Sequence, residues 1–135
     1  MPAEPKTKPT NASVADFLDA VPHPGRREDG KVVAAMMAEV SGEKPVMWGP
    51  SIVGYGSYRG STGDWPMIGF SPRKANLVLY LMSGFEGHDD LMARLGKHRT
   101  SVACLYLNRL ADVDMAVLRR LAEGSVKAMR EKYPS

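Results

Sequence analysis

Cysteine is almost absent from this chain of 135 residues, which contains Cys104 alone. A single cysteine cannot form an intramolecular disulfide, so we expect a fold without covalent cross-links. Long hydrophobic runs are absent as well: the longest strongly apolar segment, Leu77 to Met82, is far shorter than the roughly twenty residues of a membrane-spanning helix. The first residues lack the apolar core of a signal peptide. We therefore expect a cytoplasmic protein that does not interact with membranes.

The chain also has no large excess of either charge. Its 18 basic and 15 acidic residues leave a net charge of +3, and the basic excess falls in residues 97–135. A domain that binds the phosphate backbone usually concentrates far more positive charge on one surface. The basic side chains of the last predicted helix therefore indicate a solvated helix face, and nucleic-acid binding is the weaker alternative.

The pattern along the chain predicts a polar tail at residues 1–12 and a single domain at residues 13–135. Ser13 and Asp16 have the spacing of a capping box, which predicts a helix over 14–21. A second helix is predicted over 26–40, with a stop at Gly42. Its predicted inward stripe consists of Val32, Val33, Met36, Met37 and Val40.

Runs of β-type residues separated by turns follow the two predicted helices. We expect strands at 52–58, 65–70, 77–82 and 102–107, and the pattern leaves a further short strand at 46–48 open. We also expect a helix at 88–95 and a last helix capped by Asp112 or Asp114 and ending near Lys132. Short connections favour antiparallel neighbours. The order α-α-β-β-β-α-β-α predicts an α+β fold, in which helices pack on a compact antiparallel or mixed sheet of about four to five strands.

Several motifs occur in order along the chain: Pro45-Val46-Met47-Trp48-Gly49, Gly54-Tyr55-Gly56, Ser71-Pro72-Arg73-Lys74, Leu79-Tyr80-Leu81, Leu95-Gly96-Lys97 and Cys104-Leu105-Tyr106. Over about residues 13–130 they resemble the YdhG-like domain family, a domain of unknown function. The resemblance implies a compact α+β sheet covered by helices on one face. Some relatives are described as frataxin-like intracellular iron chaperones, which implies iron binding through exposed carboxylates such as Glu39 and Glu43.

The residues themselves favour a binding protein over an enzyme, because no nucleophile–base pair stands out. The kink at Gly49-Pro50 predicts a ligand pocket beside Trp48, and the basic loop residues Arg73, Lys74 and Lys97 are predicted to face an anion. Tyr80 and Cys104 complete the predicted ligand-binding set. We expect a small anionic ligand or a partner protein and no cofactor, with iron under the alternative reading. The apolar helix faces leave a homodimer open.

Cys104 permits a second interpretation. In the middle of a predicted strand, between Ala103 and Leu105, it is typical of a small buried apolar side chain. A thiol-dependent enzyme would require basic neighbours, which the segment Lys97-His98-Arg99 could supply. The three histidines have no metal-site spacing and are predicted to face solvent. The glycines at 54, 56, 60 and 63 precede strands, so we expect turns rather than a phosphate-binding loop.

Overall fold

The computed structural model describes residues 9–60, 63–85, 87–101 and 103–133. In chain order the elements are α1 (Val14–Asp19), α2 (Pro24–Ser41), β1 (Pro45–Trp48), β2 (Ile52–Tyr55), β3 (Tyr58–Gly60), β4 (Gly63–Trp65), β5 (Ile68–Pro72), β6 (Leu77–Leu81), α3 (Asp89–Leu95), β7 (Arg99–Thr100), β8 (Cys104–Leu107), the 3₁₀ helix η1 (Leu110–Asp112) and α4 (Met115–Lys132). No helix in these ranges is both long and apolar enough to cross a bilayer.

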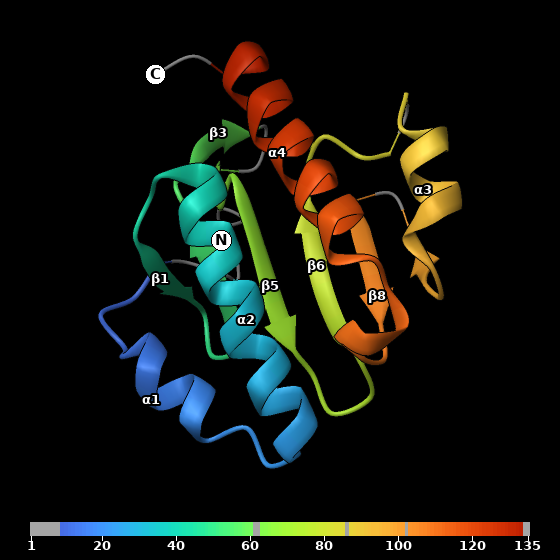
Figure 1. Cartoon of the computed structure of the whole chain (residues 1–135). Coiled ribbons are helices and arrows are strands. Elements are labelled where there is room, and N and C mark those ends of the chain that lie inside the picture. Colours follow the sequence, from blue (N-terminus) through green and yellow to red (C-terminus); the bar gives the residue numbers. More distant parts are fainter. Residues whose placement is uncertain (1–8, 61–62, 86, 102, 134–135) are drawn as a thin grey trace.

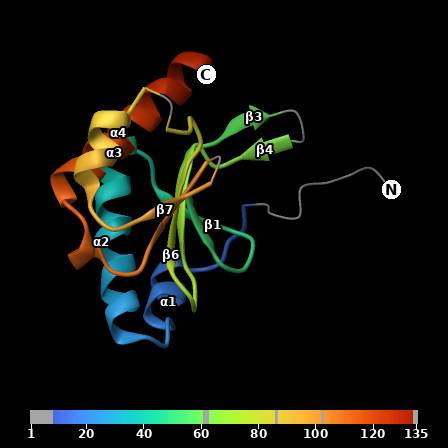
Figure 2. The ribbon, with the colours of Figure 1, turned by 90° about the vertical axis from the view of Figure 1, so that its right-hand side faces the viewer.

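Six strands form one antiparallel sheet in the order β1-β2-β5-β6-β8-β7, and β3 and β4 form a separate hairpin. The helices lie on one face of the sheet, with α2 and α4 side by side across it (Figures 1 and 2). The hairpin projects from the sheet (Figure 2). The predicted α+β class is confirmed, whereas the sheet has more strands than the predicted four to five, and the element order differs accordingly.

Two predicted strands are each divided in the structure. The predicted strand 52–58 breaks at Gly56, whose φ of 64° turns the chain out of the sheet, so that β2 ends and the hairpin begins. The predicted strand 65–70 breaks at Pro66, which has no N–H group for a ladder hydrogen bond. The short edge strand β7 was not predicted, because its two polar residues carry no alternating pattern. The predicted tail lies partly outside the described residues, but Thr10 donates its backbone N–H to the carbonyl of Met47.

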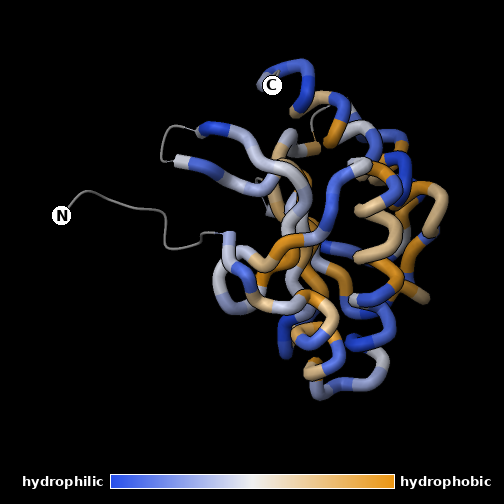
Figure 3. The backbone as a smooth tube through the Cα atoms, turned by 90° about the vertical axis from the view of Figure 1, so that its left-hand side faces the viewer, coloured by the Kyte–Doolittle hydropathy of each residue, from blue (hydrophilic) through white to orange (hydrophobic). Residues whose placement is uncertain are grey.

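The core lies between the sheet and the helices, and hydrophobic stretches gather there while the hairpin is mainly hydrophilic (Figure 3). Alternate strand residues face the helices and are almost fully buried: Val53, Tyr55, Ile68, Phe70, Leu77, Leu79, Leu81, Leu105 and Leu107. The Tyr55 hydroxyl donates to the carbonyl of Ala34 at 2.8 Å, which links β2 to α2. Burial raises the pKa of Tyr55.

Local sequence signals decide where the helices begin and end. Ser13 accepts a hydrogen bond from the N–H of Asp16, and Asp114, one of the two predicted caps, accepts from the first turn of α4. Gly42 ends α2 with a φ of 69°. Pro24 occupies the first turn of α2, where proline loses no helical hydrogen bond.

The buried stripe of α2 differs from the predicted one. Arg26, Gly30, Val33, Met37 and Ser41 are buried, a spacing of four, three, four and four residues along one helix face. Met36, a member of the predicted stripe, is buried beside them. Val32 lies about 100° around the helix axis from Val33 and is 49% exposed, so its predicted inward position is wrong. The stripe places a charged residue, Arg26, on the face that packs on the sheet.

Candidate functional site

The predicted ligand-binding residues lie in different parts of the structure. Trp48 lines a pocket beside β1, and Arg73 and Lys74 line a cavity at the β5–β6 turn. Tyr80 and Cys104 lie opposite each other on β6 and β8, on the sheet face away from the helices. Lys97 follows α3, where its backbone N–H donates to the carbonyl of Asp112, and it lines neither the pocket nor the cavity.

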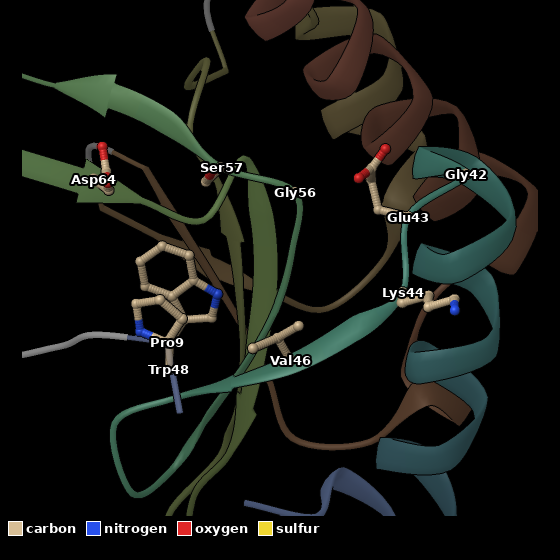
Figure 4. A pocket seen from close by; sticks show the side chains of 9 residues that line it. All are labelled: Pro9, Gly42, Glu43, Lys44, Val46, Trp48, Gly56, Ser57 and Asp64. Carbon is tan, nitrogen blue, oxygen red and sulfur yellow. The ribbon is translucent and has the colours of Figure 1, made fainter. Parts of the chain in front are cut away.

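The Trp48 pocket has a volume of about 540 Å³ and is lined by Pro9, Gly42, Glu43, Lys44, Val46, Trp48, Gly56, Ser57 and Asp64 (Figure 4). Trp48 itself is only 3% exposed. The pyrrole edge of its indole ring lies against Gly54, where a Cβ atom would come within 2.4 Å of the ring. The Lys44 ammonium points away from the indole in Figure 4. The pocket therefore lacks the basic side chains that were predicted beside Trp48.

The second space, which we call the Arg26 cavity, has a volume of about 710 Å³. It is lined by Val21, Pro22, His23, Arg26, Pro72, Arg73 and Lys74. One side comes from the α1–α2 loop and the first turn of α2, and the other from the end of β5 and the turn that follows. Val21 and Arg26 are buried, whereas His23, Arg73 and Lys74 are exposed. Positively charged side chains thus surround a partly apolar space.

Arg26 is 8% exposed and is held by backbone groups. Its guanidinium donates hydrogen bonds to three carbonyl oxygens, those of Arg73 (2.9 Å), Lys74 (3.0 Å) and Asn108 (3.0 Å). These bonds tie the start of α2 to the β5–β6 turn and to the segment after β8. Its Nε atom is buried and has no hydrogen-bond partner among the residues that the structure describes.

No carboxylate compensates the charge of Arg26 within 4.0 Å in the described ranges. Asp29, one turn further along α2, instead accepts a hydrogen bond from the backbone N–H of Leu110. A buried ion normally requires a partner of opposite charge, because removing a charge from water costs several kcal/mol. Carbonyl dipoles offset part of this cost for Arg26. The site therefore retains an uncompensated positive charge beside an open cavity.

His23 caps α2 through its imidazole ring. Its Nδ1 atom accepts a hydrogen bond from the backbone N–H of Arg26 at 3.0 Å. A ring nitrogen that accepts is unprotonated, so the neutral ring carries its proton on Nε2, which remains available as a donor. The first turn of α2 also adds the positive end of the helix dipole to this side of the cavity.

Arg73 extends to the sheet face away from the helices. Its guanidinium donates to the Tyr80 hydroxyl at 2.6 Å. Burial raises the pKa of Tyr80, and the neighbouring Arg73 charge opposes this shift. Cys104 is half-buried and faces Tyr80 across the two strands. A thiol-dependent enzyme usually has a histidine base within hydrogen-bond reach of the thiol. Within the part of the chain that the structure describes, no hydrogen bond joins the Cys104 thiol to a histidine.

The carboxylates considered for iron lie against arginines of α4. Glu39 is 3.6 Å from the guanidinium of Arg119, and Glu43 is 3.8 Å from that of Arg130. Among the residues with described positions, no group of three or more His, Cys, Asp or Glu side chains is arranged to hold a metal ion.

Sequence reasoning missed Arg26 and His23 as members of a site. Arg26 occupies the stripe that continues through Gly30, Val33 and Met37, so a charged residue in line with core positions was the available signal. His23 was predicted to face solvent; it is exposed, but it also caps α2. The partners of Arg26 are 47, 48 and 82 residues away in sequence, and no local pattern indicates such contacts.

No protein-family model, curated protein or solved structure matches this chain. The resemblance to the YdhG-like family therefore stays a prediction.

Proposed function

We propose that the protein binds a small anionic ligand in the Arg26 cavity and does not transform it chemically. The observation that carries this proposal is the buried, uncompensated guanidinium of Arg26 at the wall of an open cavity of about 710 Å³. An anion from solution would supply the missing negative charge in surroundings where charges interact more strongly than in water.

The composition of the cavity wall supports an anion over a cation. Among the described residues that line it, the ionisable side chains are those of His23, Arg26, Arg73 and Lys74, and none is a carboxylate. The N-terminus of α2 on the same side favours negative charge. A cation would meet three permanent positive charges there without an opposing group.

The proposed site retains part of the predicted one and changes the rest. We keep Arg73 and Lys74 in the proposed site and add Arg26 and His23, because all four line the same cavity. Trp48 and Lys97 lie outside the cavity lining, and we do not place Tyr80 or Cys104 in the site. The proposed ligand class is still the small anion expected from the basic loops.

The test is a titration of ¹⁵N-labelled protein with acetate and, separately, inorganic phosphate at constant ionic strength, followed by amide chemical shifts. We expect saturable shifts at Gly25, Arg26 and Lys74 rather than around Trp48. A hydrogen bond to a charged group contributes about 1.5 kcal/mol or more, so Lys74→Gln should raise the Kd about tenfold. Lys97→Gln is the matched control and should leave the Kd unchanged.

Two results would contradict the proposal. One is the absence of saturable shifts around the cavity with either anion. The other is an equal loss of affinity in Lys74→Gln and Lys97→Gln, because this would show that only the net charge of the protein matters.

A further inference from the structure

We infer that the protein forms a weak homodimer in which a groove between α2 and α4 packs against the same groove of a second copy. The two helices run side by side on the outer face of the fold (Figures 1 and 2). The groove between them, which we call the α2–α4 groove, has a volume of about 470 Å³. Its lining consists of Val32, Ala35, Met36, Glu39, Met115, Ala116 and Arg119. These residues are distinct from those of the Arg26 cavity, so this inference does not depend on the proposed function.

The floor of the α2–α4 groove is apolar and open to solvent. Val32 is 49% exposed, and it is the one large hydrophobic side chain that is exposed among the described residues. Ala35 and Ala116 are exposed beside it, and Met115 is partly exposed. A single exposed valine is ordinary on a protein surface, but these four side chains form a contiguous apolar patch. Contact with another apolar surface removes this patch from water, and the two small alanines allow a close approach.

Charged side chains of opposite sign face each other across the groove. Glu39 of α2 lies 3.6 Å from the guanidinium of Arg119 of α4, and their side chains are 64% and 42% exposed. The contact of Arg119 with Glu123 on its own helix is 3.8 Å long. Both distances exceed the length of about 2.8 Å that is typical of a charge-assisted hydrogen bond, so the two groups keep the capacity to bind a closer partner.

This charge pattern is complementary to itself. In a twofold dimer the same surface patch of both copies meets, so each contact occurs twice with the roles of the copies exchanged. A twofold axis along the groove, parallel to the helices, places α2 of each copy over α4 of the other. Glu39 of one copy then faces Arg119 of the second copy, the reciprocal pair forms at the same level, and the apolar floors meet beside them. A different protein needs no self-complementary pattern, so the pattern favours a second copy of this chain as the occupant.

The size of the helix layer predicts a weak dimer. α2 and α4 have 18 residues each, so each helix is about 27 Å long and about 10 Å wide. Together they offer about 500 Å² per copy, and the dimer buries about 1,000 Å² in total, which is near the lower limit for a specific interface. We therefore expect a Kd of about 10 to 500 μM, in the range of transient rather than obligate dimers.

The first test is analytical ultracentrifugation of the full-length protein at neutral pH over a range of concentrations. The wild type should change from monomer to dimer as its concentration rises to about 1 mM. Val32→Lys places a charge on the apolar floor and should raise the Kd at least tenfold. Ala93→Lys is the matched control, because it adds the same charge at an exposed position of α3 outside the groove, and it should leave the Kd unchanged.

An exchange of charges identifies the occupant of the groove. Glu39→Arg makes both walls positive and Arg119→Glu makes both walls negative, so each variant alone should stay monomeric through repulsion between like charges. An equal mixture of the two variants should form a mixed dimer, because an arginine of one variant then faces a glutamate of the other at both contacts. Native mass spectrometry with one variant labelled with ¹⁵N separates the mixed dimer from the two homodimers.

Three results would overturn the inference. A wild-type protein that stays monomeric up to about 1 mM shows that the patch binds no second copy with the expected affinity. Equal effects of Val32→Lys and Ala93→Lys show that any dimer uses another surface or responds only to net charge. A mixture of the two charge variants that stays monomeric shows that the groove does not face itself. A dimer in the mixture alone, together with a selective loss in Val32→Lys, supports the inference.

Discussion

Replacing Arg26 by methionine tests whether the buried guanidinium stabilises the fold, because methionine retains an unbranched apolar stem and removes the charge. Three hydrogen bonds from a charged donor contribute roughly 5 to 9 kcal/mol together. The substitution also removes the cost of burying an ion, which is several kcal/mol. We expect the free energy of unfolding to fall by about 2 to 3 kcal/mol, with most of the loss arising from carbonyls of the β5–β6 turn and Asn108 that lose their donor.

The assay is urea unfolding followed by far-ultraviolet circular dichroism, in which the midpoint should fall by about 1 to 2 M. Arg120→Met is the matched control, since Arg120 is exposed on α4 and should change stability by less than about 0.5 kcal/mol. Arg26→Lys retains the charge but not the planar fork, so its loss should lie between those of the other two variants. If Arg26→Met is as stable as the wild type, the three carbonyl hydrogen bonds do not outweigh the cost of burying the charge, and the expected stabilisation of the turn by Arg26 is refuted.

Three further predictions concern the packing, capping and ionisation of other residues. Gly54→Ala places a Cβ atom within 2.4 Å of the Trp48 ring and should destabilise the protein by about 2 kcal/mol. At Gly30, an added Cβ atom meets nothing closer than 3.5 Å, so Gly30→Ala should stabilise the protein by up to about 1 kcal/mol through the helix propensity of α2. The same urea assay measures both changes. Asp114→Ala removes the cap of α4 and should cost about 1 kcal/mol in thermal unfolding; a loss as small as that of an exposed α4 substitution would contradict the cap. The raised pKa of Tyr55 means that the folded state holds this proton more tightly than the unfolded state, so stability is complete below about pH 10 and falls as the pH rises above it. Tyr55→Phe should flatten this fall in melts between pH 9 and 11, and an unchanged slope would show that burial of this hydroxyl is not responsible.

The candidate site was predictable only in part. The adjacent basic residues Arg73 and Lys74 follow a strand and a proline, which marks an exposed turn, and the structure places both at one cavity. Trp48 was predicted to share a pocket with them, but it lies at β1, near one edge of the sheet order, whereas β5 and β6 are central. Strand order determines this separation, and the sequence of a strand carries little information about which neighbour it will pair with.

The sequence by itself determined the features that depend on neighbouring residues. Ser13, Asp114 and Gly42 mark helix ends because capping acts within one turn, and the apolar run at Leu77–Leu81 becomes a central strand because both of its faces exclude water. The tertiary structure alone decided that Arg26 is buried without a carboxylate beside it. Its hydrogen bonds join segments 47 to 82 residues apart, and they form only when α2 packs across the sheet and brings its first turn against the β5–β6 turn. Local propensity acts over a few residues, so the fold class followed from the sequence. The charge balance of a cavity depends on every segment that reaches it, so the site required the tertiary structure.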